Sequence, residues 1–163
     1  MTFFETNRLR LRNIAPEDVP VIYEYRNHPD CARYQRGQTK DLTGIEKLVA
    51  DHQGDALGTD HNCLMAVADK ESDALIGEIL VMPNEDCFSL GYTFHYAHHR
   101  QGYAFEALSA LIDILHSRYP DWEFISFTDK DNVASMKLLQ KLGYRDMGYI
   151  EKLDSQMFGK WVK

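Results

Sequence analysis

The sequence predicts an α/β (α+β) protein with a mixed, mostly antiparallel central sheet, one parallel pair of strands and about four helices. Three observations support this fold class. Strand-like and helix-like segments alternate, three strand-like runs form a meander, and one strand–helix–strand unit requires a parallel pair. No linker or repeat divides the 163 residues, which suffice for one sizeable core, so we expect a single domain over residues 1–163.

The first third of the chain predicts one strand and two helices. Arginine and leucine alternate in residues 8–12, which is typical of a half-buried strand with its cations facing solvent. Residues 16–18 (Pro-Glu-Asp) have the composition of a first helical turn. Thr43 and Glu46 have the spacing of a capping box, and apolar residues at helical spacing extend this second helix to His52.

The rest of the chain predicts an antiparallel meander, a crossover helix and a C-terminal group of elements. These are the strands 63–68, 75–82 and 88–95, the helix 104–118, the strand 124–128, the helix 135–142 and the strands 144–152 and 156–162. Gly143 is the expected C-cap of the last helix. The crossover helix makes its two flanking strands parallel neighbours with a right-handed connection.

The composition argues against two classes of partner. The chain has 18 Lys and Arg against 25 Asp and Glu, a net charge of -7, whereas proteins that bind phosphates by charge have a basic balance. The apolar stretches are far shorter than the roughly 20 residues of a membrane helix, and no signal peptide is visible. We therefore expect no nucleic acid and no membrane as partners. Cys31, Cys63 and Cys87 are far apart and odd in number, which predicts free thiols and a cytoplasmic protein.

A histidine-rich corner between the third meander strand and the crossover helix is the first candidate binding site. Its turn carries Arg100 and Gly102 and leads directly into the helix. Free backbone N–H groups at a helix start carry positive partial charge, and glycine lets a ligand approach the backbone closely. The corner predicts a seat for a pyrophosphate group. The alternative is a plain helix start with a turn glycine.

A second polar cluster follows the strand 124–128. Asn132 can cap the next helix or donate its amide to an extended ligand, and Ser135 lies one turn further on. The two clusters lie at the carboxyl ends of neighbouring parallel strands, where open α/β sheets bind ligands. The alternative is a capping asparagine and a surface serine.

These blocks resemble the GNAT superfamily of acetyl-CoA-dependent N-acetyltransferases, in particular the branch that acetylates ribosomal-protein N-termini. The segments that carry the resemblance are 5–12, 75–78, 90–94, 102–108, 132–135 and 141–144. The resemblance implies a GNAT-like sheet with a splayed parallel pair. It also implies acetyl transfer from acetyl-CoA to a primary amine, on a protein N-terminus or a small molecule, by direct attack in a ternary complex. The alternative is a non-catalytic module that binds or senses acyl-CoA.

The resemblance implies a set of cofactor-binding residues. The family's pyrophosphate motif, Gln/Arg-x-x-Gly-x-Gly/Ala, falls on His99, Gly102 and Ala104, with Arg100 where many members carry another glycine. A backbone N–H near Phe94 or His95 would polarise the thioester carbonyl. The full set is Phe94, His95, His99, Arg100, Gln101, Gly102, Tyr103, Ala104, Asn132 and Ser135.

The resemblance also suggests which residue protonates the departing thiolate. Many members use a tyrosine at the position of Leu139, so that acid is absent here. The ribosomal-protein branch is thought to use a serine at the position of Ser135, and Tyr144 is the alternative donor.

The general base is harder to assign, because Ser89 stands where relatives often carry a glutamate. Glu78 is the best remaining carboxylate, and its alternative is a surface strand residue. His95 is a second candidate that would act through a water. An N-terminal α-amine, with a pKa near about 8, needs less help than a lysine near about 10.4.

The last expectations concern metals, the acceptor and oligomers. The histidines of the corner lack a second ligand cluster, so we expect no metal. The segment 26–53, which contains Tyr34 and Arg36, should shape the acceptor pocket. Phe158 and Trp161 could be partly exposed in the closing strand and pair with a second copy, which leaves a monomer or a homodimer open.

Overall fold

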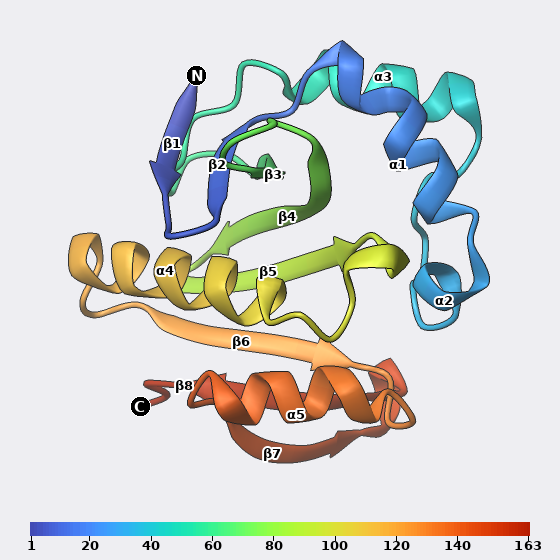
Figure 1. The fold of residues 1–163 in the computed structure, drawn as a ribbon. Helices are drawn as coiled ribbons and strands as arrows, with labels where there is room; N and C mark the ends of the chain where they lie inside the picture. The colour runs from blue at the N-terminus through green and yellow to red at the C-terminus, as the bar shows by residue number, and fades with distance from the viewer.

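The computed structural model describes residues 1–163 and contains one eight-stranded sheet with the order β1-β2-β3-β4-β5-β6-β8-β7 (Figure 1). The strands are β1 (Thr2–Glu5), β2 (Leu9–Asn13), β3 (Cys63–Asp69), β4 (Leu75–Asn84), β5 (Cys87–Phe94), β6 (Glu123–Thr128), β7 (Arg145–Ile150) and β8 (Ser155–Lys160). The helices are α1 (Val19–Arg26), α2 (Pro29–Ala32), α3 (Leu42–His52), α4 (Tyr103–Arg118) and α5 (Val133–Lys141). The predicted α/β class and mostly antiparallel sheet are confirmed, with five helices rather than about four.

β5 and β6 form the parallel pair, and they separate almost at once. Only Cys87 with Glu123 and Phe88 with Phe124 are in register, although both strands continue beyond these pairs. β4 holds β5 along its length on one side, and β8 holds β6 on the other. The sheet therefore opens between β5 and β6, and the resemblance's expectation of a splayed pair is confirmed.

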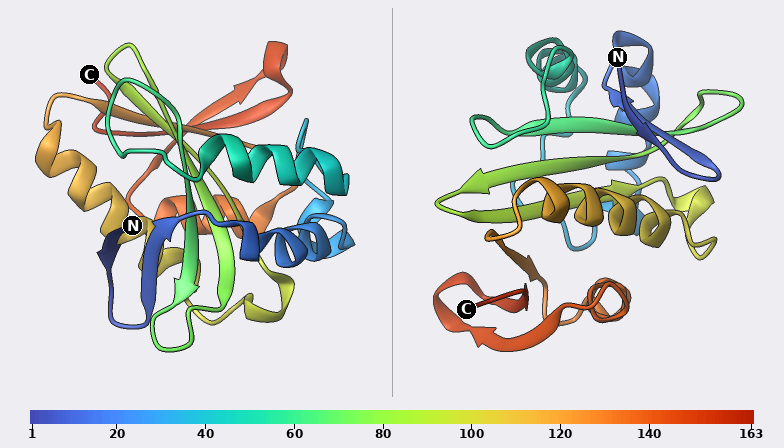
Figure 2. Two further views of the ribbon diagram at one scale, coloured as in Figure 1. Left: turned by 90° about the horizontal axis from the view of Figure 1, so that it is seen from above. Right: turned by 90° about the vertical axis from the view of Figure 1, so that its left-hand side faces the viewer.

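Helices cover both faces of the sheet, as Figure 2 shows from two sides. α1, α2 and α3 pack on one face, where Ile22 and Ile45 are fully buried beside Leu64 of β3. α4 and α5 pack on the other face, where Leu111 and Leu139 are buried. Each fully buried aliphatic side chain contributes about 1.5–3 kcal/mol relative to an exposed one.

α4 forms because its apolar residues share one face. Ala107, Leu108, Leu111, Ile112 and Leu115 recur at helical spacing, and each is at most 2 % exposed. Burial of this stripe fixes the helix against β5 and β6. Its N-terminus is thereby held next to the end of β5, where the sheet opens.

The N-terminal elements differ in detail from the prediction. β1 and the four-residue α2 have too few residues to show a periodic pattern, and neither was predicted. The predicted capping box of α3 is wrong, because Thr43 lies inside the helix. Asp41 is the N-cap, and its Oδ2 accepts a hydrogen bond from the Gly44 N–H at 3.0 Å. A carboxylate two residues earlier therefore takes the cap position.

The expectation that Phe158 is available for dimer formation is also wrong. β8 lies between β6 and β7, and Phe158 is 0 % exposed in the core. Trp161 is 40 % exposed, and its ring stacks on His116 with the ring centroids 3.6 Å apart. Because both edges of β8 are already paired, this strand has no free edge for a second copy.

Three further features bear on the earlier expectations. Cys31, Cys63 and Cys87 are free thiols, the first two of them buried. The helices are too short or too polar to cross a bilayer. No group of three or more His, Cys, Asp or Glu side chains is arranged to hold a metal ion.

Candidate active site

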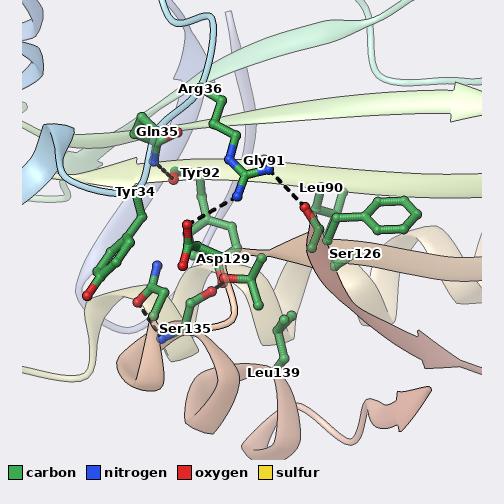
Figure 3. Close-up of a pocket in the computed structure, with 14 residues that line it drawn as sticks. Tyr34, Gln35, Arg36, Leu90, Gly91, Tyr92, Ser126, Asp129, Ser135 and Leu139 are labelled. Atoms are coloured by element: carbon green, nitrogen blue, oxygen red, sulfur yellow. Dashed lines mark hydrogen bonds and ion pairs between the residues drawn. The ribbon is translucent and has the colours of Figure 1, made fainter. Parts of the chain in front are cut away.

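A cleft of about 280 Å³ lies where the sheet opens between β5 and β6 (Figure 3). Its walls come from residues 34–36, from residues 90–92 of β5, from residues 126–129 at the end of β6, and from α5. α5 contributes Asn132, Ser135 and Leu139. The second predicted polar cluster therefore lines this cleft, together with residues from the segment expected to shape the acceptor pocket.

The N-terminus of α4 lies at the open end of β5 without a cap. Gly102 is the N-cap residue in a left-handed conformation with φ +81°, and no side chain caps the helix. No acceptor in the protein takes the N–H groups of residues 103–105. By contrast, Asp41 and Asn132 cap α3 and α5 with their own side chains. The uncapped end of this 16-residue helix is suited to an anion.

The backbone at Arg100 explains why a glycine suits this position. Arg100 has φ +63°, in the left-handed region that a residue with a side chain adopts at a cost of about 1–2 kcal/mol. The resemblance places a glycine here in many relatives, which would relieve this strain. Strained residues collect at ligand sites. The exposed Arg100 guanidinium adds positive charge beside the free N–H groups.

A hydrogen-bond network from the turn between β1 and β2 holds this corner in place. Arg8 donates from Nε to Glu106 Oε1 at 2.7 Å and from Nη1 to the Gln101 carbonyl at 2.9 Å. Thr6 Oγ1 donates to Glu106 Oε2. Burial alone would raise the pKa of Glu106, but the hydrogen bonds from Thr6 and Arg8 lower it overall. Sequence reasoning missed this network and treated Arg8 as a solvent-facing cation.

One backbone N–H of β5 points toward the gap without a partner on β4. The His95 N–H donates to the Ile76 carbonyl at 2.8 Å, so it is not the free donor that the sequence suggested. This bond makes Gly77 and Phe94 a non-hydrogen-bonded pair of the antiparallel ladder, which points the N–H of Phe94 away from β4. The Phe94 N–H therefore faces the β5–β6 gap.

The histidines of the corner are engaged in local hydrogen bonds. His95 Nε2 lies 2.8 Å from Glu24 Oε2, and its Nδ1 accepts from the Ala97 N–H at 3.0 Å. His99 Nε2 donates to the Phe94 carbonyl at 2.7 Å. His99 therefore braces the turn against β5 through Nε2, while its Nδ1 has no partner in the protein.

On α5, the structure brings the predicted pair together and adds a partner. Asn132 Oδ1 accepts from the Ser135 N–H at 3.2 Å, so Asn132 caps the helix while its amide nitrogen has no partner in the protein. Ser135 Oγ lies 3.0 Å from the hydroxyl of Tyr92, on β5. Tyr92 was not among the predicted site residues. Its position on the strand beside the opening was the signal that could have identified it.

The two remaining catalytic candidates are both buried. Tyr144 is 4 % exposed in the core and does not line the cleft. Glu78 is 2 % exposed, which contradicts the alternative of a surface residue. Arg26 donates from Nε to Glu78 Oε1 at 2.7 Å, while Glu78 Oε2 has no hydrogen-bond partner. Glu78 lies beside Thr93 of β5, on the opposite sheet face from Ser135.

A segment that we call the strap, residues 33–41, closes one side of the cleft. Arg36 donates to Asp129 Oδ2 at 3.1 Å (Figure 3) and to the Asp154 carbonyl at 2.8 Å. The backbone N–H of Asp131 and the Arg36 guanidinium lower the pKa of Asp129. The strap thereby joins the part of the sheet before the opening to the part after it.

The family is shown by comparison with known proteins. A family model described as an acetyltransferase (GNAT) domain matches residues 8–145. The fold and this match define the class: a GNAT-type acetyltransferase, which uses acetyl-CoA as its co-substrate. The chain belongs to the GNAT acetyltransferase family.

Individual relatives are distant but similar along their length. The Bacillus subtilis protein YnaD, described as an uncharacterized N-acetyltransferase, is 24% identical over 149 residues, which cover 90% of this chain and 85% of YnaD. YkkB of the same organism is 28% identical over 163 residues and covers 97% of this chain and 89% of its own.

Solved structures share the fold. A GNAT-family acetyltransferase from Bacillus anthracis superposes with a TM-score of 0.81 at 19% identity and covers 98% of this chain and 96% of its own. RimL, a ribosomal L7/L12 alpha-N-protein acetyltransferase in complex with coenzyme A, superposes with a TM-score of 0.80 at 14% identity, with 98% and 97% coverage.

Proposed function

We propose that this protein transfers an acetyl group from acetyl-CoA to a primary amine by direct attack in a ternary complex. One observation carries the proposal: the uncapped N-terminus of α4 adjoins a gap in the sheet, and the gap is lined by a free backbone N–H and by the Ser135 hydroxyl. An anion seat and a polar cleft at one opening of the sheet fit a long thioester that carries a pyrophosphate group.

Gly102, Tyr103 and Ala104 hold the pyrophosphate in this proposal, through N–H groups that have no partner in the protein. Arg100 adds charge at the same corner. Gly102 has φ +81°, a backbone conformation that a residue with a side chain adopts only with strain. The free amide nitrogen of Asn132 is placed to donate to the pantetheine arm.

The Phe94 N–H stabilises the developing oxyanion. A preorganised donor of this kind is worth about 10²–10³ in rate. Phe94 replaces His95 in this role, since the His95 N–H is bonded to Ile76. His95 and His99 serve as braces of the turn.

The acid and the base lie on opposite faces of the sheet. Ser135 protonates the departing thiolate from the α5 side, because Tyr144 is enclosed in the core and Leu139 carries no proton. Glu78, on the face of α1 to α3, accepts the proton of the incoming amine through its unpartnered Oε2 and a water. The amine and the thioester thus approach the gap from opposite sides.

The acceptor approaches beside the strap and is a protein N-terminus or a small amine. Similarity of fold to RimL favours the N-terminus. An α-amine has a pKa near about 8, so it requires only modest help from Glu78.

The test is an acetylation assay with a panel of amines. The panel contains glycinamide, lysine, spermidine and short peptides with free N-termini, and the readouts are free thiol from coenzyme A and the mass of the product. We expect acetyl-CoA consumption that depends on one class of amine. If acetyl-CoA raises the melting temperature but no amine is acetylated, the protein is an acyl-CoA-binding module instead.

A further inference from the structure

The hydroxyl groups of Tyr92 and Ser135 form a pair across the opening of the sheet. Tyr92 projects from β5 and Ser135 from α5, and the two oxygens lie 3.0 Å apart (Figure 3). The two residues are 43 positions apart in the sequence, so this contact depends on the tertiary fold. Neither hydroxyl has another hydrogen-bond partner in the protein, so each one depends on the other.

Either hydroxyl of this pair can be the donor of the hydrogen bond. Each hydroxyl has one proton to donate. Within the protein, each hydroxyl is the other's only hydrogen-bond partner. When Tyr92 donates to Ser135, the serine proton is left free to point into the cleft that both residues line. The phenol therefore orients the serine hydroxyl toward whatever occupies the cleft.

We propose that Tyr92 is the positioning residue behind Ser135, orienting its proton toward the departing sulfur and replacing that proton as it leaves. This inference rests on the proposed acetyl transfer and on the role of Ser135 within it. Tyr92 itself does not touch the reacting atoms.

The proton transfers balance. As the carbon–sulfur bond breaks, the Ser135 O–H proton moves to the sulfur and the Tyr92 O–H proton moves to Ser135 Oγ. Glu78 takes the proton that the amine nitrogen releases when the amide forms and passes it to solvent, from which the Tyr92 oxygen is reprotonated. Coenzyme A leaves as the thiol, and both hydroxyls are restored for the next turnover.

A serine hydroxyl needs such a partner. An alkoxide is a far stronger base than a thiolate, so an isolated serine would give up its proton only at high cost. A phenol, with an ordinary pKa of about 10, is a much better donor. Burial raises the pKa of Tyr92, so the phenol keeps its proton through neutral and mildly alkaline pH. The pair is therefore fully protonated and ready at the start of each turnover.

Tyr92→Phe, Ser135→Ala and the double variant test the proposal. The measurements are the single-turnover rate with the amine that the panel identifies, its solvent deuterium isotope effect, and the acetyl-CoA Kd. We expect Tyr92→Phe to slow the chemical step about tenfold, within the range of general acid catalysis, while the Kd for acetyl-CoA changes little. Tyr23→Phe, at an exposed tyrosine on α1, is the matched control and should retain full activity.

The double variant separates a shared role from two independent ones. Since Tyr92 acts through Ser135, the double variant should be no slower than Ser135→Ala alone, and the isotope effect should fall in Tyr92→Phe. An unchanged rate in Tyr92→Phe overturns the inference and leaves the acetyltransferase proposal intact, as does a loss in the double variant equal to the product of the single losses. A wild-type protein that acetylates no amine overturns both.

Discussion

Glu78 pairs with Arg26 and is also the proposed general base, so its effects on stability and on rate have to be measured separately. Arg26 donates to Glu78 Oε1 at 2.7 Å, and both side chains are almost fully enclosed. A buried ion pair is costly to break, because the remaining charge has no partner. One oxygen of Glu78 is nevertheless unpartnered, which is the feature expected of a base that works through a water. Glu78 therefore has a structural role as the partner of Arg26 and a proposed catalytic role as the base.

Glu78→Gln should lower both stability and rate. The neutral amide leaves Arg26 uncompensated, and breaking such a pair costs about 3–5 kcal/mol of unfolding free energy. Adding Arg26→Met removes the stranded charge and should restore much of the stability, as thermal unfolding would show. The rate should stay low in the double variant, because the base is still absent. Recovery of the rate together with the stability would make Glu78 purely structural.

Ser135→Ala should lower kcat at least about tenfold with little change in acetyl-CoA affinity, since the hydroxyl acts mainly in the transition state. Steady-state kinetics and calorimetry measure the two quantities. Ser117→Ala, at an exposed serine on α4, is the control. A wild-type kcat in Ser135→Ala would show that water protonates the thiolate. Loss of affinity at unchanged kcat would make Ser135 a cofactor-binding residue.

At the scale of elements, the anion seat is a property of α4 rather than of one side chain. Its sequence has no Ser, Thr, Asp or Asn at the N-cap, and the stripe from Ala107 to Leu115 anchors the helix so that its uncapped end is held beside the gap. A ligand anion can supply what a capping side chain supplies in α3 and α5.

Gly102→Glu should abolish the rise in melting temperature that acetyl-CoA causes. The new carboxylate would lie where the phosphates bind, and the left-handed backbone adds a strain of about 1–2 kcal/mol. Gly148→Glu is a matched control, because Gly148 also has a positive φ (+103°) and has nothing within 4 Å of an added Cβ. Thermal unfolding with and without acetyl-CoA compares them. An unchanged shift in a folded Gly102→Glu protein would mean that the pyrophosphate binds elsewhere.

The strap provides a second prediction at this scale. Arg36 ties it to Asp129 and to the Asp154 carbonyl, so Arg36→Ala should loosen one wall of the cleft. We expect a several-fold higher KM for the amine and little change in the acetyl-CoA Kd. Lys40→Ala, at an exposed cation of the same segment, controls for the loss of charge. Equal KM values for the amine in the two variants would show that the Arg36 contacts of the strap do not contribute to acceptor binding.

At the scale of the molecule, the sequence predicted what depends on local patterns. The periodicity of α4 and the alternation of the meander strands placed the elements around the opening. Local patterns could not show which side chains meet across the fold. Arg8 and Glu106 are 98 positions apart, so no local sequence pattern indicates the hydrogen bond between them. Tyr92 was missed for the same reason, and the burial of Glu78 was left open, because burial on a two-sided sheet depends on which helices cover each face.

The proposed direct transfer depends on the arrangement of the whole sheet. The opening between β5 and β6 joins two faces that each carry one helix layer. Ser135 and Tyr92 lie on one side, and Glu78 lies on the other. In the proposed mechanism, the thioester and the amine therefore occupy opposite sides of one gap.

A crystal structure with coenzyme A tests this claim most directly. We predict that the pyrophosphate accepts hydrogen bonds from the N–H groups of residues 102–104, and that the sulfur lies in the gap between the Phe94 N–H and the Ser135 hydroxyl. Coenzyme A bound away from the β5–β6 gap, or with its sulfur outside reach of Ser135, would contradict the claim.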